Sequence, residues 1–268
     1  MRHERLTPKQ WASERLERLE ELSIGKVIPS ALTLLGLCAG ATAIRFALEQ
    51  EWKLAVIAIF SAMMFDMLDG RAARWLGADS RFGAQLDSLA DLVSFGVAPA
   101  VLTFTWSLWQ MGDAGWVAAL IFCVCSAIRL ARFNIQAARD EGATQSHPYF
   151  TGLPTPAAAC VMMLPLLLNF DTAKELFRHP LFGMVLIGIT STLMVSHVPT
   201  PSLKFIRMDD PLSRIAVAVM AVAFVPCAVY VPWTTLITGM TVYVCSIPFF
   251  IHKQHAERNT EYRTQGSE

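Results

Sequence analysis

The chain has 268 residues, of which 54% are hydrophobic and only 16% are charged. Soluble domains usually carry about 25% charged residues, so this composition argues against a soluble protein. The 22 Lys and Arg balance the 22 Asp and Glu, and a net charge of zero argues against nucleic acid as a partner. Apolar runs of about 20 residues, the length that crosses a bilayer as a helix, recur along the chain.

Residues 1–27 are polar and highly charged, and we predict a cytoplasmic N-terminal segment without a secretory signal. Within this segment, residues 8–23 place Trp11, Leu16 and Leu19 at helical spacing among charged residues. Two interpretations stay open. The stretch is either an amphipathic helix that lies on the membrane surface or a short solvated helix.

Eight apolar segments predict an all-α fold, a polytopic transmembrane bundle with a six-helix core and two C-terminal helices. The predicted segments are 28–48, 53–75, 83–109, 114–137, 154–170, 180–197, 213–230 and 233–251. Pro99 lies inside the third segment and is expected to kink it. Pro226 and Pro232 could make the last two segments shorter, tilted or a re-entrant hairpin. We assign residues 28–251 to one membrane-embedded domain and 252–268 to a cytoplasmic tail.

Basic residues predict the orientation of this bundle. In a topology with eight membrane spans, four of the 22 Lys and Arg residues lie on one side of the membrane: Arg45, Lys53, Lys174 and Arg178. The other 18 share the side of both termini. Because cytoplasmic loops carry an excess of Lys and Arg, both termini are predicted to be cytoplasmic, as is the turn between the second and third helices.

Four aspartates surround that turn: Asp66, Asp69, Asp87 and Asp91. Residues three or four apart share a helix face, so two adjacent antiparallel helices would aim all four carboxylates at one point. Unpaired carboxylates in apolar surroundings cost several kcal/mol, and one or two divalent cations would compensate them. Oxygen ligands suit Mg²⁺ or Mn²⁺. The alternative is that each Asp pairs with a neighbouring Arg of the same turn, such as Arg71, Arg74 or Arg81.

The pattern Asp-x2-Asp-Gly-x2-Ala-Arg-x8-Gly-x3-Asp-x3-Asp runs from Asp66 to Asp91. It resembles the signature of the CDP-alcohol phosphotransferases, which displace CMP from a CDP-alcohol. The resemblance implies that Asp66, Asp69 and Asp87 hold the metal ions. It also implies that Asp91 contributes to one ion and takes the proton of the attacking hydroxyl as the catalytic base.

A nucleotide site is expected beside the metals. Arg74 offers a permanently charged donor fork to a phosphate, and Gly70 and Ala73 leave room for a cytosine ring. The resemblance adds Ser80, and it adds Ser30 and Thr33 from a Pro-Asn-x2-Thr element in which Ser30 replaces the usual Asn. The predicted residues that bind CDP-diacylglycerol are Ser30, Thr33, Asp69, Gly70, Ala73, Arg74, Ser80 and Gly83.

The stretches 91–100, 129–134 and 150–157 resemble the integral-membrane phosphatidylserine synthases of bacteria and archaea. This resemblance implies that CDP-diacylglycerol and L-serine react to give phosphatidylserine and CMP, and that the protein is a homodimer. Arg129 and Arg132 share a helix face and could bind the serine carboxylate, or they could be cytoplasmic anchors. The predicted serine-binding residues are Arg129, Arg132, Asn134 and Gly152.

Two other functions were weighed. An acceptor with its own phosphate, such as glycerol-3-phosphate, would need a further basic cluster, for which Lys204, Arg207 and Arg214 are candidates. A cation transporter would need access from both faces of the membrane. The aspartates are predicted at one end of their helices with Arg74 among them, which disfavours a transporter.

Overall fold

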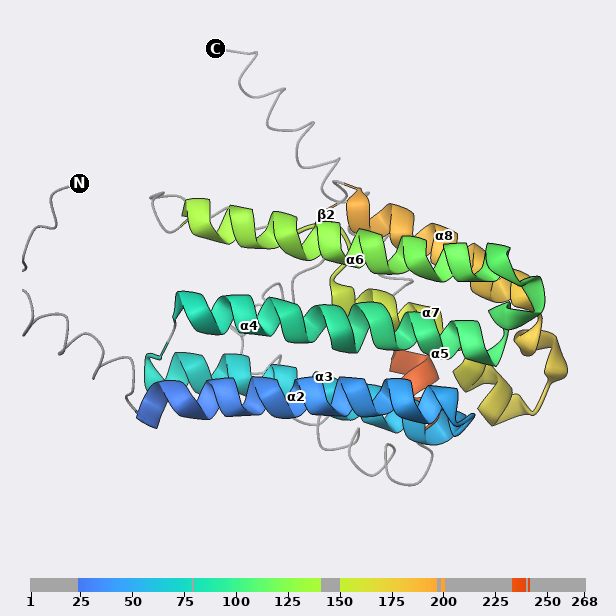
Figure 1. The fold of residues 1–268 in the computed structure, drawn as a ribbon, viewed down its shortest axis with the longest axis horizontal. Helices are drawn as coiled ribbons and strands as arrows, with labels where there is room; N and C mark the ends of the chain where they lie inside the picture. The colour runs from blue at the N-terminus through green and yellow to red at the C-terminus, as the bar shows by residue number, and fades with distance from the viewer. Residues whose placement is uncertain are drawn as a thin grey trace, which may run out of the picture.

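The computed structural model describes residues 24–78, 80–140, 150–196, 199–200, 233–239 and 241. The long helices lie side by side with roughly parallel axes (Figure 1). They are α2 (Ile24–Leu48), α3 (Trp52–Leu76), α4 (Arg81–Asp91), α5 (Ala98–Trp106), α6 (Asp113–Asp140), α7 (Thr155–Thr172) and α8 (Pro180–Val195). A π-helix, η1 (Leu92–Val97), joins α4 to α5, and short 3-10 turns, η2 (Leu108–Met111) and η3 (Glu175–Arg178), precede α6 and α8. Two-residue strands, β1 (Phe150–Thr151) and β2 (Pro199–Thr200), pair antiparallel.

The all-helical prediction is confirmed. Six of the eight predicted segments match described helices, because α4, η1 and α5 follow one another as a single rod. The predicted segment 213–230 and the possible surface helix at 8–23 lie outside the described residues. Of the predicted segment 233–251, residues 233–239 are described as helix.

Four helices are long and apolar enough to cross a membrane: Val27–Leu48, Arg81–Trp106, Asp113–Gln136 and Thr155–Thr172. Large apolar side chains also point outward along the bundle. Ile57 is 52% exposed, Val124 56% and Val185 58%. Exposed apolar surface on this scale is unfavourable in water, so these faces are suited to contact lipid. The composition, the helix lengths and the outer surface therefore agree on an integral membrane bundle.

Small residues let α2 pack directly against the π-helix. A Cβ added at Gly40 would lie 2.7 Å from both Cα and Cβ of Ser94. One turn earlier, the Ser94 hydroxyl donates a hydrogen bond to the carbonyl oxygen of Gly36 over 3.3 Å. Small residues spaced four apart are a common means of close helix contact in membranes. The Gly36–Gly40 face of α2 therefore fixes the position of η1.

The π-helix begins immediately after Asp91. Pro99, which was expected to kink the third segment, lies two residues beyond this π-helix, in the first turn of α5. Proline has no backbone N–H, so one hydrogen bond of a regular α-helix cannot form at Pro99. The wider turn of the π-helix lies where that hydrogen bond is missing. The irregularity of the rod is therefore located at 92–97, next to a predicted site residue.

Gly40→Ala should destabilise the protein, because the new methyl group meets the backbone of Ser94 rather than a movable side-chain end. Overpacking of this kind costs about 1–3 kcal/mol. The midpoint of thermal unfolding in detergent, followed by tryptophan fluorescence, would measure the loss. Gly188→Ala in α8 is the matched control, since no atom lies within 4 Å of its added Cβ. Equal midpoints for the two variants would contradict this account of the α2–η1 contact.

Candidate active site

A tight turn makes α3 and α4 an antiparallel pair. Gly77 ends α3 at φ 56°, a left-handed conformation that suits glycine, and its N–H binds the carbonyl oxygens of Ala73 and Arg74. Ser80 then caps α4, because its hydroxyl oxygen accepts a hydrogen bond from the N–H of Gly83 at 3.0 Å. Residues equally far before and after this turn therefore face one another across the two helices.

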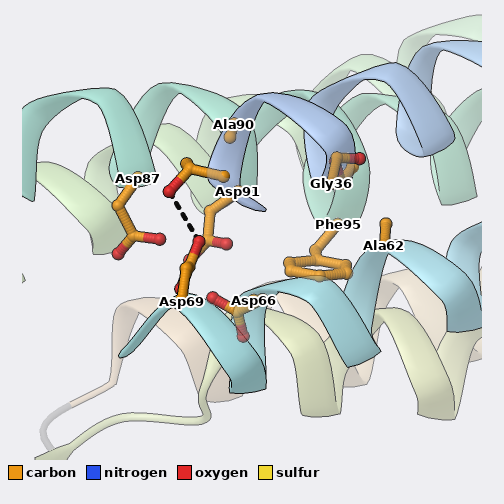
Figure 2. Close-up of a pocket in the computed structure, with 10 residues that line it drawn as sticks. Gly36, Ala62, Asp66, Asp69, Asp87, Ala90, Asp91 and Phe95 are labelled. Carbon is orange, nitrogen blue, oxygen red and sulfur yellow. Dashed lines mark hydrogen bonds between the residues drawn. The ribbon is translucent and has the colours of Figure 1, made fainter. Parts of the chain in front are cut away.

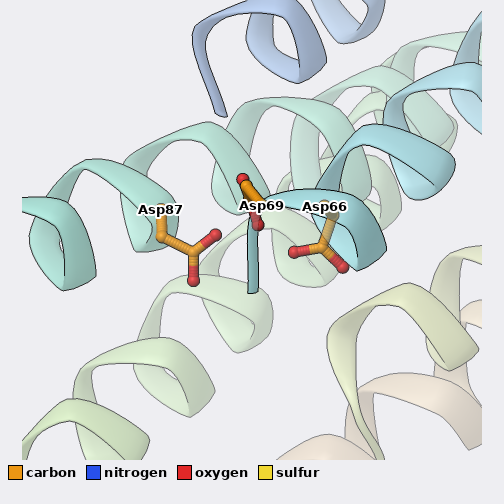
Figure 3. A group of neighbouring side chains, drawn as sticks. All are labelled: Asp66, Asp69 and Asp87. Atoms are coloured by element: carbon orange, nitrogen blue, oxygen red, sulfur yellow. The ribbon is translucent and has the colours of Figure 1, made fainter. Parts of the chain in front are cut away.

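This pairing brings three of the predicted metal ligands together. Carboxylate oxygens of Asp66, Asp69 and Asp87 all lie within 4.8 Å of one another (Figure 3). Opposite ligands around one Mg²⁺ would be separated by about 4.2 Å, since each Mg–O distance is about 2.1 Å. An all-oxygen, anionic donor set of this size fits hard divalent cations. The group could therefore hold a metal ion.

Asp91 and Thr33 complete the same pocket (Figure 2). The Thr33 hydroxyl, from α2, donates a hydrogen bond of 2.6 Å to Asp69, which is only 5% exposed. Asp91 lines this pocket together with Asp66. The pocket contains about 190 Å³ of open space including its mouth, and its other lining residues are Gly36, Ala62, Ala90, Ser94 and Phe95.

The pocket has no basic residue among those that line it. Within the described residues, no salt bridge joins these carboxylates to Arg71 or Arg74. The alternative in which the aspartates pair with Arg71 or Arg74 therefore finds no support among the described residues. A bound cation would compensate the clustered charge.

The predicted nucleotide contacts extend from this pocket toward the α3–α4 turn. Gly70 follows Asp66 by four residues and Ala73 follows Asp69 by four, so each lies one turn further along the same face of α3 as its aspartate. A Cβ added at Gly70 would meet no atom within 4 Å, so there is open space beside it. Arg74 lies exposed in the last turn of α3. On α2, half-buried Ser30 lies one turn before Thr33.

The predicted serine contacts lie on the α6 side of Asp91, outside the pocket itself. Nη1 of Arg129 donates a hydrogen bond of 2.8 Å to the hydroxyl of Thr155. Asn134 accepts a hydrogen bond of 3.0 Å from Ser88 of α4 through its Oδ1. Both residues therefore join α6 to elements around the site.

Arg132 and Gly152 contact the end of α8. Arg132 Nη1 donates a 2.7 Å hydrogen bond to the carbonyl oxygen of Val195. Gly152 has φ 84°, and a Cβ added there would lie 2.8 Å from the carbonyl oxygen of Met194. Glycine is therefore required at this position by both conformation and space.

Sequence reasoning missed several residues of the site. It assigned no role to Gly36, Ser94 or Phe95, which line the pocket, or to Thr155, which holds Arg129. The spacing of Gly36 and Gly40 was the available signal for a close helix contact. Thr155 gave no such signal, because its partner lies on another helix.

The chain belongs to the CDP-alcohol phosphatidyltransferase family, whose model matches residues 26–196. It is 38% identical over 231 residues to the CDP-diacylglycerol–serine O-phosphatidyltransferase of Mycobacterium leprae, covering 85% of this chain and 76% of that protein. The enzyme of the same name from Bacillus subtilis is 35% identical over 177 residues, 66% of this chain and 91% of the relative. Among solved structures, the Mycobacterium tuberculosis phosphatidylinositol phosphate synthase, in complex with manganese and citrate, gives a TM-score of 0.46. It is 22% identical, and the match covers 62% of this chain and 78% of that one.

Thr33→Val should weaken metal binding, because the hydrogen bond that orients Asp69 is lost while the side-chain shape is kept. Removal of such a supporting contact typically lowers metal affinity about 10–100-fold. Titration of the purified protein with Mn²⁺, followed by electron paramagnetic resonance, measures this directly. Thr42→Val is the control, since the Thr42 hydroxyl bonds only to Cys38 of its own helix among the described residues. Unchanged Mn²⁺ affinity in Thr33→Val would refute the role of Thr33.

Proposed function

We propose that the protein is a CDP-diacylglycerol–serine O-phosphatidyltransferase, which transfers the phosphatidyl group to the hydroxyl of L-serine and releases CMP. The observation that carries the chemistry is the convergence of Asp66, Asp69 and Asp87 on one point, with Asp91 in the same pocket. The names of the similar enzymes, which act on serine, support the choice of acceptor.

Asp66, Asp69 and Asp87 are proposed to hold two divalent ions, Mg²⁺ or Mn²⁺, with Asp91 contributing to one of them. When bound, such ions neutralise the pyrophosphate and stabilise the leaving CMP. Thr33 supports the set by fixing Oδ2 of the Asp69 carboxylate through its 2.6 Å hydrogen bond. The support for this proposal is the all-oxygen donor set and the small spread of its atoms.

The nucleotide is proposed to lie along α3, from the carboxylates toward the turn. The open space at Gly70, with Ala73 one turn on, admits the flat cytosine ring. Arg74 and Ser80 then bind phosphate oxygens. The Ser80 oxygen accepts from Gly83, so its own O–H proton is the group that it offers. Ser30 on α2 would donate from the opposite side.

Asp91 is proposed to be the general base. The serine hydroxyl oxygen forms a bond to phosphorus, the bond from phosphorus to the CMP oxygen breaks, and the hydroxyl proton moves to Asp91. The position of Asp91 suits this role, because it lies in the pocket with Asp66, Asp69 and Asp87 and directly precedes the π-helix that packs against α6. A base must lie within reach of both the metal-bound phosphate and the incoming alcohol.

The serine substrate is proposed to bind on the α6 side, with its carboxylate toward Arg129 and Arg132. Each guanidinium carries five N–H donors, of which the bonds to Thr155 and to Val195 use one each. Asn134 has an amide NH₂ to offer, since its Oδ1 is occupied by Ser88. The backbone at Gly152 would complete the pocket.

We further propose that both termini and the active site face the cytoplasm and that the protein works as a homodimer. The distribution of Lys and Arg supports the orientation. The start of α2, the turn between α3 and α4 and the end of α6 lie at one end of the bundle (Figure 1). Thus the pocket opens near the end at which the basic residues are concentrated.

The acceptor assay is the most direct test. Purified protein in detergent should convert CDP-diacylglycerol and labelled L-serine to labelled phosphatidylserine, detected by thin-layer chromatography and mass spectrometry. EDTA should abolish the product, and added Mg²⁺ or Mn²⁺ should restore it, because the carboxylate cluster needs its ions. If labelled glycerol-3-phosphate gave a labelled lipid and labelled serine gave none, the acceptor would be glycerol-3-phosphate instead of serine. Full activity in the presence of EDTA would refute the proposed requirement for divalent metal ions.

Asp91→Asn should lower turnover at least about 100-fold, since general-base catalysis contributes about 10²–10⁴-fold and the amide accepts no proton. The substitution keeps the side-chain size. Binding of CDP-diacylglycerol, measured by its protection against thermal unfolding, should therefore largely persist. Near wild-type turnover in this variant would exclude Asp91 as the base.

A further inference from the structure

The contact between Arg129 and Thr155 has no place in the chemistry described so far. Arg129 reaches from α6 to the first residue of α7, where its Nη1 lies 2.8 Å from the Thr155 hydroxyl oxygen. Thr155 is completely buried, and Arg129 stands on α6, which packs against the π-helix that follows Asp91. A buried hydroxyl therefore fixes one nitrogen of a guanidinium on a helix beside the proposed base.

Two prolines and a closely packed glycine restrict the backbone around Thr155. Pro154 and Pro156 restrict the backbone on both sides of it. Gly152, at φ 84°, lies so close to the end of α8 that a Cβ would be 2.8 Å from the carbonyl oxygen of Met194. A hydrogen-bond acceptor mounted on such a segment cannot move far to follow its partner.

A hydroxyl at this position needs an explanation. A fully buried hydroxyl costs free energy unless it is hydrogen-bonded, and valine would fill the same volume without that cost. Arginine is long and loses several rotamers when it is fixed in one conformation. The contact is charge-assisted, which makes it stronger than an ordinary hydrogen bond and directional. The physical effect of the hydroxyl is therefore to restrict the guanidinium to one place.

We propose that Thr155 is a positioning residue that holds the Arg129 guanidinium on the α6 side of Asp91, where it binds the anionic group of the acceptor alcohol. With that group held, the acceptor hydroxyl is aligned with Asp91. The inference rests on the proposed function for the role of Asp91, but it requires only that the acceptor carry an anionic group, which is the carboxylate in serine and the phosphate in a polyol phosphate.

The test compares Thr155→Val with Thr155→Ser in steady-state assays. Thr155→Val keeps the volume and removes the hydrogen-bond acceptor, so the KM for L-serine should rise about 10–100-fold, the range for loss of a hydrogen bond to a charged group. The KM for CDP-diacylglycerol should change less than about twofold, because the nucleotide lies on the other side of Asp91. Thr155→Ser should restore the KM for serine. Thr190→Val is the matched control, since buried Thr190 bonds only within α8 among the described residues.

Other results would overturn the proposal. Equal changes in both KM values, or a loss of thermal stability without a change in the KM for serine, would make the contact a simple tie between α6 and α7. If Thr155→Val does not fold, Thr155→Ser and Arg129→Lys still decide. Arg129→Lys keeps the positive charge but loses the planar guanidinium group. If Thr155 positions Arg129, Arg129→Lys should raise the KM for the acceptor and Thr155→Ser should not. If glycerol-3-phosphate proves to be the acceptor, the proposed function is wrong. The effect of Thr155→Val on the KM for glycerol-3-phosphate, compared with its effect on the KM for CDP-diacylglycerol, then tests Thr155 separately.

Discussion

Mutual repulsion among carboxylates is the constraint on which this structure depends. Asp66, Asp69 and Asp87 bring their oxygens within 4.8 Å, and two like charges at that distance repel by about 3–4 kcal/mol in a medium of effective dielectric constant near 20. Three such pairs approach the whole stability of an ordinary domain. Packing must therefore hold the helices together against this repulsion, and a divalent cation bound between the carboxylates would offset it.

Small residues provide that packing around the π-helix. On one side, Gly40 brings the backbone of α2 against Ser94. On the other, a Cβ added at Gly96 would lie 3.1 Å from the Cβ of Ser126 in α6. Thus η1 is held between two helices directly after Asp91. Because its neighbours leave no room, η1 cannot rotate without moving α2 or α6. The direction in which Asp91 points is set by these contacts rather than by the carboxylates, which would otherwise separate.

The parts of the site that follow local periodicity could be predicted from the sequence, and the parts that depend on tertiary contacts could not. Asp66 with Asp69, and Asp87 with Asp91, share faces by helical spacing alone, so their convergence needed only an antiparallel pair. The hydrogen bond from Thr33 to Asp69 joins residues 36 apart, and periodicity says nothing of it. The π-helix also gives no periodic signal. Pro99 indicated an irregularity in this rod, but not that the irregularity begins at Leu92.

Asp91 lies at the boundary between two electrostatically different halves of the site. The half formed by α2, α3 and α4 is anionic and attracts cations, so it suits a pyrophosphate only through bound ions. The half formed by α6 and the start of α7 carries Arg129 and Arg132. In the proposed direct transfer both substrates are bound at once, and this difference in local charge would favour each substrate in its own half. The acceptor could then change through residues of α6 and α7 while the carboxylates and their chemistry stay the same, because no acceptor contact proposed here lies on α3.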